Sequence, residues 1–477
     1  MASWDELVDS TLATLAGKNL LFMQRLITLP PPVPPSRTFA GPGPWDRPTV
    51  EIRLDGASTQ EWLALNGLVS EEGDEVDRKV VLFSGNDYIG LATHPAVLEA
   101  AAKAAQGPGM GPRSSSLIFG YTTYHKLAEE SLADLLKMED CLLCPTGYAA
   151  NTSVMSAIGS IISLSATGRN AAQDERIAIF SDAWNHASII DGIRLAERQQ
   201  EAVAFVYKHC DMSHLESLLS GCSMAKKVVV TDSLFSMDGD FAPLPELVKL
   251  RSKYGFLLVV DDAHGTFLCG ENGGGIPEMF GCEDGIDICV GSLSKGGGCQ
   301  GGFIACSIRW KKLIISRGRP FMFSSALPLP IIASLLAAIH VSKKEGWRRS
   351  LVWDHVKYFA SLTKLNITSP IIPIIVGTEE AVLKAHRHLH RSGFLVIPIR
   401  PPVVPANSCR FRNSYFPLLI YANKKNIYSP FQPRLIDFGT PGRLRVSLSS
   451  AHTSDDIKRL VDALSPWLPT CASASRL

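Results

Sequence analysis

Two short apolar runs that end in polar residues constrain the fold more than any other part of this sequence. The first run covers residues 257–261, ends in Asp261 and is soon followed by His264. The second covers residues 288–292 and is soon followed by Lys295. Such runs are typical of buried parallel strands, and the carboxyl ends of those strands form the ligand-binding edge of an open α/β sheet. The sequence therefore predicts an α/β protein in which these side chains meet at one sheet edge.

The residue types at that edge suit pyridoxal 5'-phosphate. The amine of Lys295 can hold the aldehyde of this cofactor, whose ring then withdraws electrons from a carbanion. A carboxylate about 4 Å from the ring nitrogen contributes roughly 4 kcal/mol at an effective dielectric of about 20, which is on the order of three pKa units. We therefore expect Asp261 to keep the ring nitrogen protonated at neutral pH.

The order of these residues resembles the α-oxoamine synthases, a family within the fold type I pyridoxal phosphate enzymes. The motifs that carry the resemblance are Asp-x-Ala-His-Gly at 261–265, Ser-x-Ser-Lys-Gly at 292–296, Asn-His-Ala-Ser at 185–188, Phe-Ser-Met-Asp-Gly-Asp at 235–240 and Ser-Gly-Asn-Asp-Tyr-Ile-Gly-Leu at 84–91. Each of these motifs follows or ends an apolar run. The resemblance implies a fold type I transferase, an α/β protein with a large, mainly parallel sheet.

We expect three parts along the chain of 477 residues. Residues 1–48 are predicted to form an N-terminal arm, with an amphipathic helix from Trp4 to about residue 26 and a proline-rich linker. Residues 49–341 are predicted to form the large cofactor-binding unit. Residues 342–477, where charged helices alternate with short strands, are predicted to form a smaller C-terminal α/β unit.

The resemblance implies four catalytic residues at the strand ends. It implies that Lys295 carries the cofactor and moves the α-proton of the amino acid, while Asp261 pairs with the ring nitrogen. His264 would bind the ring hydroxyl, and His186 would stack on the ring and position substrate groups.

Further residues are implied to contact the phosphate end of the cofactor. A glycine-containing turn that opens a helix presents free amide groups to an anion, and the resemblance assigns this contact to Gly147 and Tyr148. Ser236 would lie beside the cofactor, and Ser292 would bind its phosphate. Ser325, or its neighbour Ser324, would reach the phosphate in the neighbouring subunit, which implies a homodimer with shared active sites.

The string Ile-Arg-Pro-Pro-Val-Val-Pro at 399–405 resembles the biotin-pathway members of the family, which condense L-alanine with pimeloyl-CoA or another pimeloyl thioester. By this resemblance Arg400 and Val403 contact substrate, although the subgroup often has threonine where Val403 stands. Arg445 would bind the amino-acid carboxylate, and Arg25 could reach the site from the arm. The alternatives are glycine with acetyl-CoA or succinyl-CoA, serine with a long acyl-CoA, and a catalytically silent partner subunit.

Residues 409–441 interrupt the family pattern between this string and Arg445. The segment is rich in aromatic residues and proline and has no clear period. It is interpreted as a disordered insertion, or alternatively as a lid near the substrate entrance.

Several other functions are disfavoured by the sequence. The net charge is +1, which gives no basic surface for nucleic acid, and no apolar run approaches the ~20 residues that span a bilayer. Cys141 and Cys144 have metal-ligand spacing without a second pair, so we expect structural cysteines and no metal. The glycines at 296–301 match a dinucleotide-binding pattern but precede a predicted strand, whereas that pattern must open a helix.

The chain ends in Ser475-Arg476-Leu477, a variant of the peroxisomal import signal. We expect recognition by the peroxisomal import receptor, with the cytosol as the alternative location.

Overall fold

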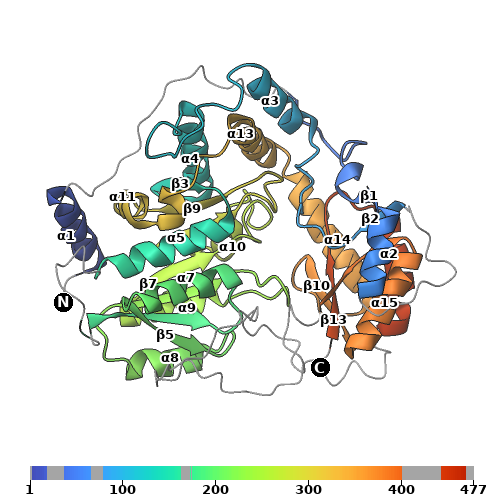
Figure 1. Cartoon of the computed structure of the whole chain (residues 1–477). Helices are drawn as coiled ribbons and strands as arrows, with labels where there is room; N and C mark the ends of the chain where they lie inside the picture. The colour runs from blue at the N-terminus through green and yellow to red at the C-terminus, as the bar shows by residue number, and fades with distance from the viewer. Residues whose placement is uncertain are drawn as a thin grey trace.

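The structure is a computed structural model of the chain that describes residues 3–18, 37–65, 79–162, 172, 175–399 and 442–468. Its centre is a seven-stranded sheet with the strand order β3-β9-β8-β7-β6-β4-β5 (Figure 1). β9 is antiparallel to both of its neighbours, and the other neighbouring strands are parallel. The strands are β3 (Asp140–Cys144), β4 (Ile177–Asp182), β5 (Ala202–Tyr207), β6 (Lys227–Asp232), β7 (Leu257–Asp261), β8 (Ile288–Ser292) and β9 (Gly302–Cys306).

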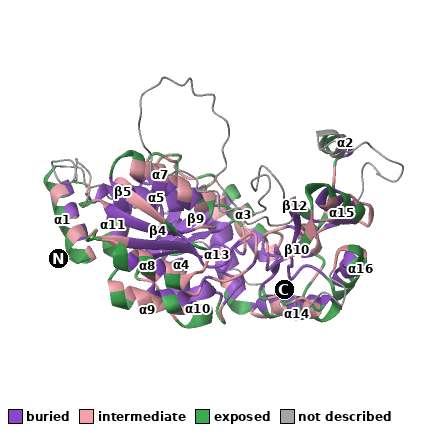
Figure 2. Cartoon of the chain, turned by 90° about the horizontal axis from the view of Figure 1, so that it is seen from below, coloured by how far each residue is buried: buried purple, intermediate pink, exposed green. Residues whose placement is uncertain are grey.

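Helices cover both faces of this sheet because successive side chains of a strand point to opposite faces. Leu258 and Val260 of β7 belong to one buried cluster, whereas Leu257 and Val259 belong to the other. Figure 2 shows the buried strands between two layers of helices. One layer comprises α1 (Trp4–Gly17), α5 (Gly147–Ser160), α7 (Ala187–Arg198) and α11 (Ile308–Arg317). The other comprises α3 (Pro95–Gln106), α4 (Thr123–Leu136), α8 (Met212–Gly221), α9 (Leu244–Tyr254) and α13 (Leu329–Lys344).

Two smaller sheets lie beside this central unit, with strand orders β1-β2-β11 and β10-β13-β12. Their strands are β1 (Glu51–Arg53), β2 (Lys79–Leu82), β10 (Ile371–Gly377), β11 (Phe394–Leu395), β12 (Ile397–Ile399) and β13 (Gly442–Ser447). A third buried cluster joins β2, β10, β11 and β13 to α14 (Trp347–Thr363), α15 (Glu379–Arg391) and α16 (Ser454–Leu464). The remaining helices are α2 (Gly56–Leu65), α10 (Gly275–Phe280), α12 (Arg319–Met322) and the short 3-10 turns η1 (Arg47–Thr49), η3 (Glu283–Gly285) and η4 (Ser465–Trp467).

The N-terminal strands correct one part of the predicted domain organisation. Residues 49–341 were predicted to form the large unit. Within this range, however, β2 pairs with β1 and β11 and not with the central sheet. Val81 and Phe83 are buried in the same cluster as Phe394. The chain therefore contributes to the smaller unit both before and after it builds the central sheet.

The strands that were predicted to carry the site form as expected. β7 and β8 are buried, parallel neighbours, and the glycines at 296–301 lead into strand β9 instead of a helix. The N-terminal helix begins at Trp4 as predicted but ends at Gly17, well before residue 26, since glycine weakens a helix. Among the described residues, no helix combines the length and the apolarity that a membrane span needs.

A buried ionic cluster connects distant parts of the chain. Arg348 donates hydrogen bonds to Asp46 at 2.8 Å and to Glu345 at 2.7 Å, and both acids are almost completely buried. The same guanidinium contacts the carbonyl oxygen of Ile89 at 3.2 Å. The cluster thus joins the N-terminal segment to the start of α14 and to the Ser84–Leu91 motif.

Candidate active site

Four neighbouring parallel strands end at the same edge of the central sheet. The last residues of these strands are Asp182, Asp232, Asp261 and Ser292. Asp232 and Asp261 are direct partners in the register of β6 and β7. The loop that follows β8 brings Lys295 to this edge, so the predicted acid and amine belong to one site.

Lys295 is the half-buried amine of this site. Burial lowers the pKa of Lys295 to about 8, while the neighbouring Asp261 and Asp232 act in the opposite direction. A lysine with such a pKa is partly neutral near physiological pH and can act as a nucleophile or a base.

Asp261 is held by two donors. Asn151 Nδ2 donates to Asp261 Oδ2 at 2.6 Å, and the amide of Ala263 donates to Oδ1 at 2.9 Å. Asn151 Nδ2 also donates to Ser188 Oγ at 2.9 Å, and Ser188 Oγ lies 2.7 Å from His186 Nδ1. These contacts form a continuous hydrogen-bonded path from Asp261 to His186.

The position of the proton on His186 follows from the same path. Nδ1 of His186 accepts a hydrogen bond from the amide of Ser188 at 3.2 Å, so in the neutral ring the proton is on Nε2. His186 precedes α7 as its N-cap residue, and the side chain is exposed at the site. Its Nε2–H is therefore free to face a bound molecule.

His264 follows Asp261 in the loop after β7, and its side chain is buried. Its Nδ1 is 2.7 Å from the hydroxyl of Tyr88. Burial holds the pKa of His264 well below its ordinary value, and burial raises the pKa of Tyr88 to about 12. The phenol of Tyr88 thus stays protonated and can donate a hydrogen bond to Nδ1 of the neutral imidazole. The ring proton of His264 is then on Nε2, which can donate to a bound molecule.

Arg445 reaches the site from β13 of a different sheet. Its Nε donates to the carbonyl oxygen of Ser236 at 2.6 Å, and its Nη2 donates to Asn86 Oδ1 at 3.1 Å. The Tyr88 hydroxyl is 3.5 Å from the same Nη2. These three oxygens are neutral, so the contacts orient the guanidinium and leave its charge available for a carboxylate.

The first turn of α5 lies beside Ser292 and fits an anion. Thr146 caps this helix by accepting a hydrogen bond from the amide of Ala149 at 3.0 Å. The amides of Gly147 and Tyr148 are first-turn donors without a partner inside the helix. A Cβ atom at position 147 would lie 3.2 Å from Cβ of Ser292, so a glycine keeps the two segments close together.

The residues at this edge fit pyridoxal phosphate. Oδ1 of Asp232 and Oδ1 of Asn151 are buried, and neither has a hydrogen-bond partner among the described residues. Both lie next to Asp261, where a bound polar group can satisfy them. An amine, an acid, two imidazoles and a helix N-terminus are therefore found at one sheet edge, with the donors and acceptors that this cofactor needs.

Three residues that were predicted to contact the cofactor, Ser236, Tyr148 and Ser325, have side chains or carbonyl groups that contact other parts of the protein. Ser236 contributes its carbonyl oxygen to Arg445. The Tyr148 hydroxyl donates to Asp191 at 2.7 Å, although its backbone amide is in the first turn of α5. Ser325 pairs with Ser115 in an isolated bridge and lines a small cavity with His125 and Glu129. Arg25, Arg400 and Val403 lie outside the described residues.

Four site residues were missed by the sequence analysis: Asn86, Tyr88, Asn151 and Asp232. Asp232 ends an apolar run in the same way as Asp261, so the rule that selected Asp261 could have found it. Asn151 lies four positions after Gly147 on α5, which places both residues on one helix face. Asn86 and Tyr88 belong to the Ser84–Leu91 motif, which indicated the family but did not indicate that these two side chains contact Arg445 and His264.

Comparisons with known proteins agree with this geometry. The aminotransferase class I and II family matches residues 78–464 of the chain. An 8-amino-7-oxononanoate synthase of Arabidopsis thaliana is 51% identical over 98% of this chain and 96% of its own. A second one, from Anaeromyxobacter dehalogenans, is 40% identical over 82% of this chain and 87% of its own.

The chain belongs to the aminotransferase class I and II family, among the 8-amino-7-oxononanoate synthases.

Solved structures agree on the fold of this family member. A serine palmitoyltransferase variant from S. paucimobilis, with a bound aldimine of pyridoxal phosphate and myriocin, has a TM-score of 0.69 at 23% identity and covers 86% of this chain and 96% of its own. An 8-amino-7-oxononanoate synthase from Francisella tularensis has a TM-score of 0.61 at 21% identity and covers 81% of this chain and 97% of its own. The predicted fold type I architecture is therefore confirmed.

Proposed function

We infer that this chain is a pyridoxal phosphate-dependent acyltransferase that condenses L-alanine with pimeloyl-CoA, or a pimeloyl carrier thioester, to give 8-amino-7-oxononanoate, CO2 and free CoA or the carrier thiol. The single observation that carries the inference is the 51% identity to an 8-amino-7-oxononanoate synthase along almost the whole chain. The site geometry supports the same reaction, because a half-buried lysine with a lowered pKa, neighbouring acids and an arginine held by neutral oxygens are all found at this site.

Pyridoxal phosphate, when bound here, would supply an electron-withdrawing ring that stabilises a carbanion. Asp261, fixed by Asn151 and Ala263, would keep the ring nitrogen protonated. His264 donates Nε2–H toward the ring hydroxyl, since Tyr88 occupies Nδ1. The first turn of α5, together with Ser292, binds the phosphate.

Arg445 binds the carboxylate of L-alanine in this proposal. Ser236 and Asn86 hold Nε and Nη2, and among the described residues no group bonds Nη1, which is thus directed to substrate. Lys295 takes the α-proton on Nζ, because its lowered pKa makes the neutral amine accessible. His186 directs its Nε2–H to the incoming thioester and orients the thioester for attack.

The test is the release of CoA by the purified holoenzyme. We expect release from pimeloyl-CoA with L-alanine, and at least about tenfold lower kcat/KM with glycine or with acetyl-CoA or succinyl-CoA, because an unfilled apolar pocket loses about that much. A Lys295→Ala variant is the matched control and should lose activity by about 10⁴-fold. A preference for glycine with a short acyl-CoA would contradict the assignment.

We also propose that the active enzyme is a homodimer. The large apolar side chains of Ile118, Phe119 and Phe323 are 51%, 52% and 71% exposed. The Ser115–Ser325 bridge joins the two loops that carry them. Exposed apolar side chains on adjoining loops favour burial against a second copy, and light scattering after gel filtration tests this. A fully active monomer would refute it.

We propose in addition that the Ser475-Arg476-Leu477 terminus directs the protein to peroxisomes through the import receptor. The support is the tripeptide itself. A fluorescent protein fused ahead of the chain should form peroxisomal puncta, and removal of Leu477 should return it to the cytosol. Cytosolic fluorescence of the unaltered fusion would contradict the proposal.

A further inference from the structure

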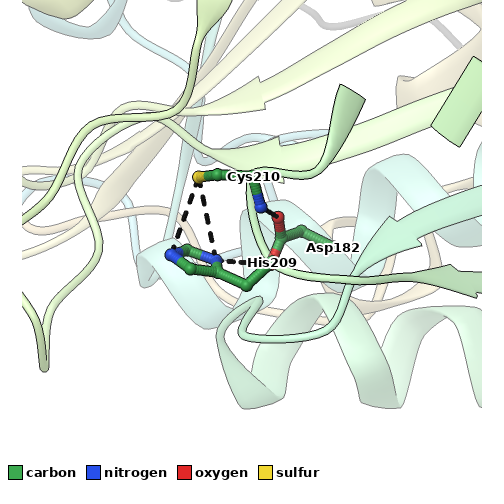
Figure 3. A group of neighbouring side chains, drawn as sticks. All are labelled: Asp182, His209 and Cys210. Carbon is green, nitrogen blue, oxygen red and sulfur yellow. Dashed lines mark hydrogen bonds and ion pairs between the residues drawn. The ribbon is translucent and has the colours of Figure 1, made fainter. Parts of the chain in front are cut away.

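A histidine outside the predicted site is bound by two carboxylates. His209 Nδ1 lies 2.9 Å from Asp182 Oδ1, and His209 Nε2 lies 2.6 Å from Asp240 Oδ2. The imidazole stacks on Trp184 with a centroid distance of 3.5 Å and contacts Phe235 edge-on at 4.4 Å. Figure 3 shows the His209 ring next to both Asp182 and Cys210. We call the contact between His209 and the two acids the His209 bridge.

The bridge is an ion-pair contact and not a metal centre. Asp182, His209 and Cys210 lie close enough for a shared metal ion. However, both ring nitrogens face carboxylate oxygens, so both act as donors, and an imidazole with two protons has no lone pair for a metal. The two acids raise the pKa of His209 to about 11. The ring is therefore a cation at physiological pH.

Each acid of the bridge belongs to a segment that carries a candidate active-site residue. Asp182 ends β4, and its Oδ1 also accepts from the amide of Trp184 at 2.8 Å. The loop that it fixes continues directly into His186, the N-cap of α7. The orientation of the His186 ring thus depends on a loop that the bridge holds.

Asp240 closes the turn that follows β6. The amide of Phe235 donates to the carbonyl oxygen of Asp240 at 3.0 Å, and the amide of Gly239 donates to the carbonyl of Phe235 at 2.9 Å. The same turn offers the carbonyl oxygen of Ser236 to Arg445. The bridge therefore joins the loop of His186 to the turn on which Arg445 is oriented.

We propose that His209 is a positioning residue of this enzyme: through Asp182 and Asp240 it fixes the spacing between His186 and the carboxylate-binding Arg445. The proposal rests on the proposed function, since it assigns these two residues to L-alanine and its acyl donor. His209 acts only through other side chains and contacts no reacting atom in this scheme.

The first experiment compares two histidine variants of the full-length holoenzyme. His209→Phe keeps an aromatic ring against Trp184 and removes both ion pairs. His214→Phe is the matched control, because His214 belongs to the same β5–α8 region and its Nδ1 accepts from the amide of Lys208. We expect His209→Phe to raise the KM for L-alanine about tenfold, since small displacements of a binding group have large effects. The KM for pimeloyl-CoA should change less, and the control should match the wild type.

A second variant, Asp240→Asn, tests the same bridge at a more exposed position, where a substitution disturbs folding less. The side chain of Asp240 is 41% exposed, whereas that of Asp182 is 1% exposed, so Asp240→Asn removes one ion pair without leaving a buried charge. We expect a smaller rise in the KM for L-alanine, of about threefold, because the amide oxygen of asparagine can still accept a weaker, uncharged hydrogen bond from His209 Nε2–H.

The protonation of His209 can be followed in the apoprotein through Trp184. The charged ring stacks on the indole as a cation–π pair, and the difference in fluorescence between the wild type and Trp184→Phe reports its loss. The groups that face His209 are Asp182, Asp240 and Cys210. We expect a transition near pH 11 in the wild type, and one at least about one unit lower in Asp240→Asn, where an ion pair is missing.

The outcomes separate the two proposals. An unchanged KM for L-alanine in a folded His209→Phe or Asp240→Asn enzyme would overturn the positioning role, even if thermal stability falls. A wild-type enzyme that releases no CoA with L-alanine and pimeloyl-CoA would instead overturn the proposed function, and the positioning role with it. A raised KM for L-alanine in both variants, with an unchanged control, would support the positioning role of His209.

Discussion

Asn151 is the residue on which most contacts of the candidate site converge. Its amide group donates to the carboxylate of Asp261 and to the hydroxyl of Ser188, which in turn contacts His186. A single side chain on α5 therefore fixes both the acid of the site and the imidazole that faces substrate. Hydrogen bonds to charged groups of this kind contribute about 1.5–3 kcal/mol each.

Replacing Asn151 by Ala should therefore reduce catalysis without abolishing cofactor binding. The carboxylate of Asp261 loses its 2.6 Å donor, which should lower kcat by about thirtyfold, corresponding to about 2 kcal/mol. Steady-state CoA release measures the loss. Ser156→Ala on the same helix is the control and should retain wild-type kcat. Equal rates for both variants would show that the path from Asp261 to His186 has no catalytic role.

The pKa of Lys295 sets an expected pH dependence. Burial lowers this pKa to about 8, and only the neutral amine can take the α-proton, so kcat should rise with pH and level off above about 8. Below that value the rise should approach tenfold per pH unit, as expected for one deprotonation.

The measurement for Lys295 is kcat for CoA release at saturating substrates between about pH 6 and 9. Lys343→Ala, which removes an amine that pairs with Asp134 at the surface, should give the same profile. A rate that is constant across this range would exclude Lys295 as the base of the rate-limiting step.

Prediction from sequence succeeded where a residue's position in a strand determines its surroundings. Asp261 and Ser292 end apolar runs, and the ends of parallel strands meet by necessity. Asn151 and Asn86 were missed because a helix or loop position does not specify which distant residue it will contact. Arg445 was found by resemblance alone, and the oxygens that orient it could not have been inferred from its own strand.

At the scale of elements, the turn after β6 connects the central sheet to the smaller unit. Gly239 in this turn has a φ of +67°, and a Cβ atom there would overlap the carbonyl oxygen of Ile371 on β10. The neighbouring Asp238 forms an ion pair with Arg443 of β13. The turn therefore needs a glycine for two reasons, its left-handed backbone and the close approach of another strand.

These two reasons can be separated with a matched pair of glycines. Gly239→Ala adds both backbone strain and a clash, whereas Gly255→Ala adds strain alone, because Gly255 has a φ of +65° and no atom within 4 Å of the added Cβ. Backbone strain costs about 1–3 kcal/mol, and the clash should add to it. Thermal melting should show a clearly larger loss for Gly239→Ala, and equal losses would contradict the close packing.

At the scale of the whole molecule, Arg348 holds together segments that are far apart in the sequence. It binds Asp46 and Glu345 within the protein interior, where removal of one partner leaves charges buried without compensation. Long-range contacts of this kind also explain why the sequence predicted the parallel sheet but placed β1 and β2 in the large unit. β2 pairs with β1 and with β11, which lies far along the chain, and short strands carry no signal of which edge they join.

Arg348→Met should destabilise the protein by about 3–5 kcal/mol, because two buried carboxylates lose their cation. Urea unfolding measures the loss, and limited proteolysis should show earlier cleavage in the segment around Asp46. Lys357→Met on the same helix removes only an exposed pair with Asp354, and it should leave stability almost unchanged. A similar small effect for both variants would mean that the buried cluster is not a structural link.

The delivery of Arg445 by β13 has a consequence for the order of events during protein synthesis. The guanidinium and its partner Asn86 are 359 positions apart, and Asp261 and Lys295 lie between them in the sequence. A ribosome therefore synthesises the residues proposed to hold the cofactor before it reaches the residue proposed to bind the amino-acid carboxylate. Arg445 can take its place beside Asn86 only after β13 has been translated and has folded against the earlier part of the chain.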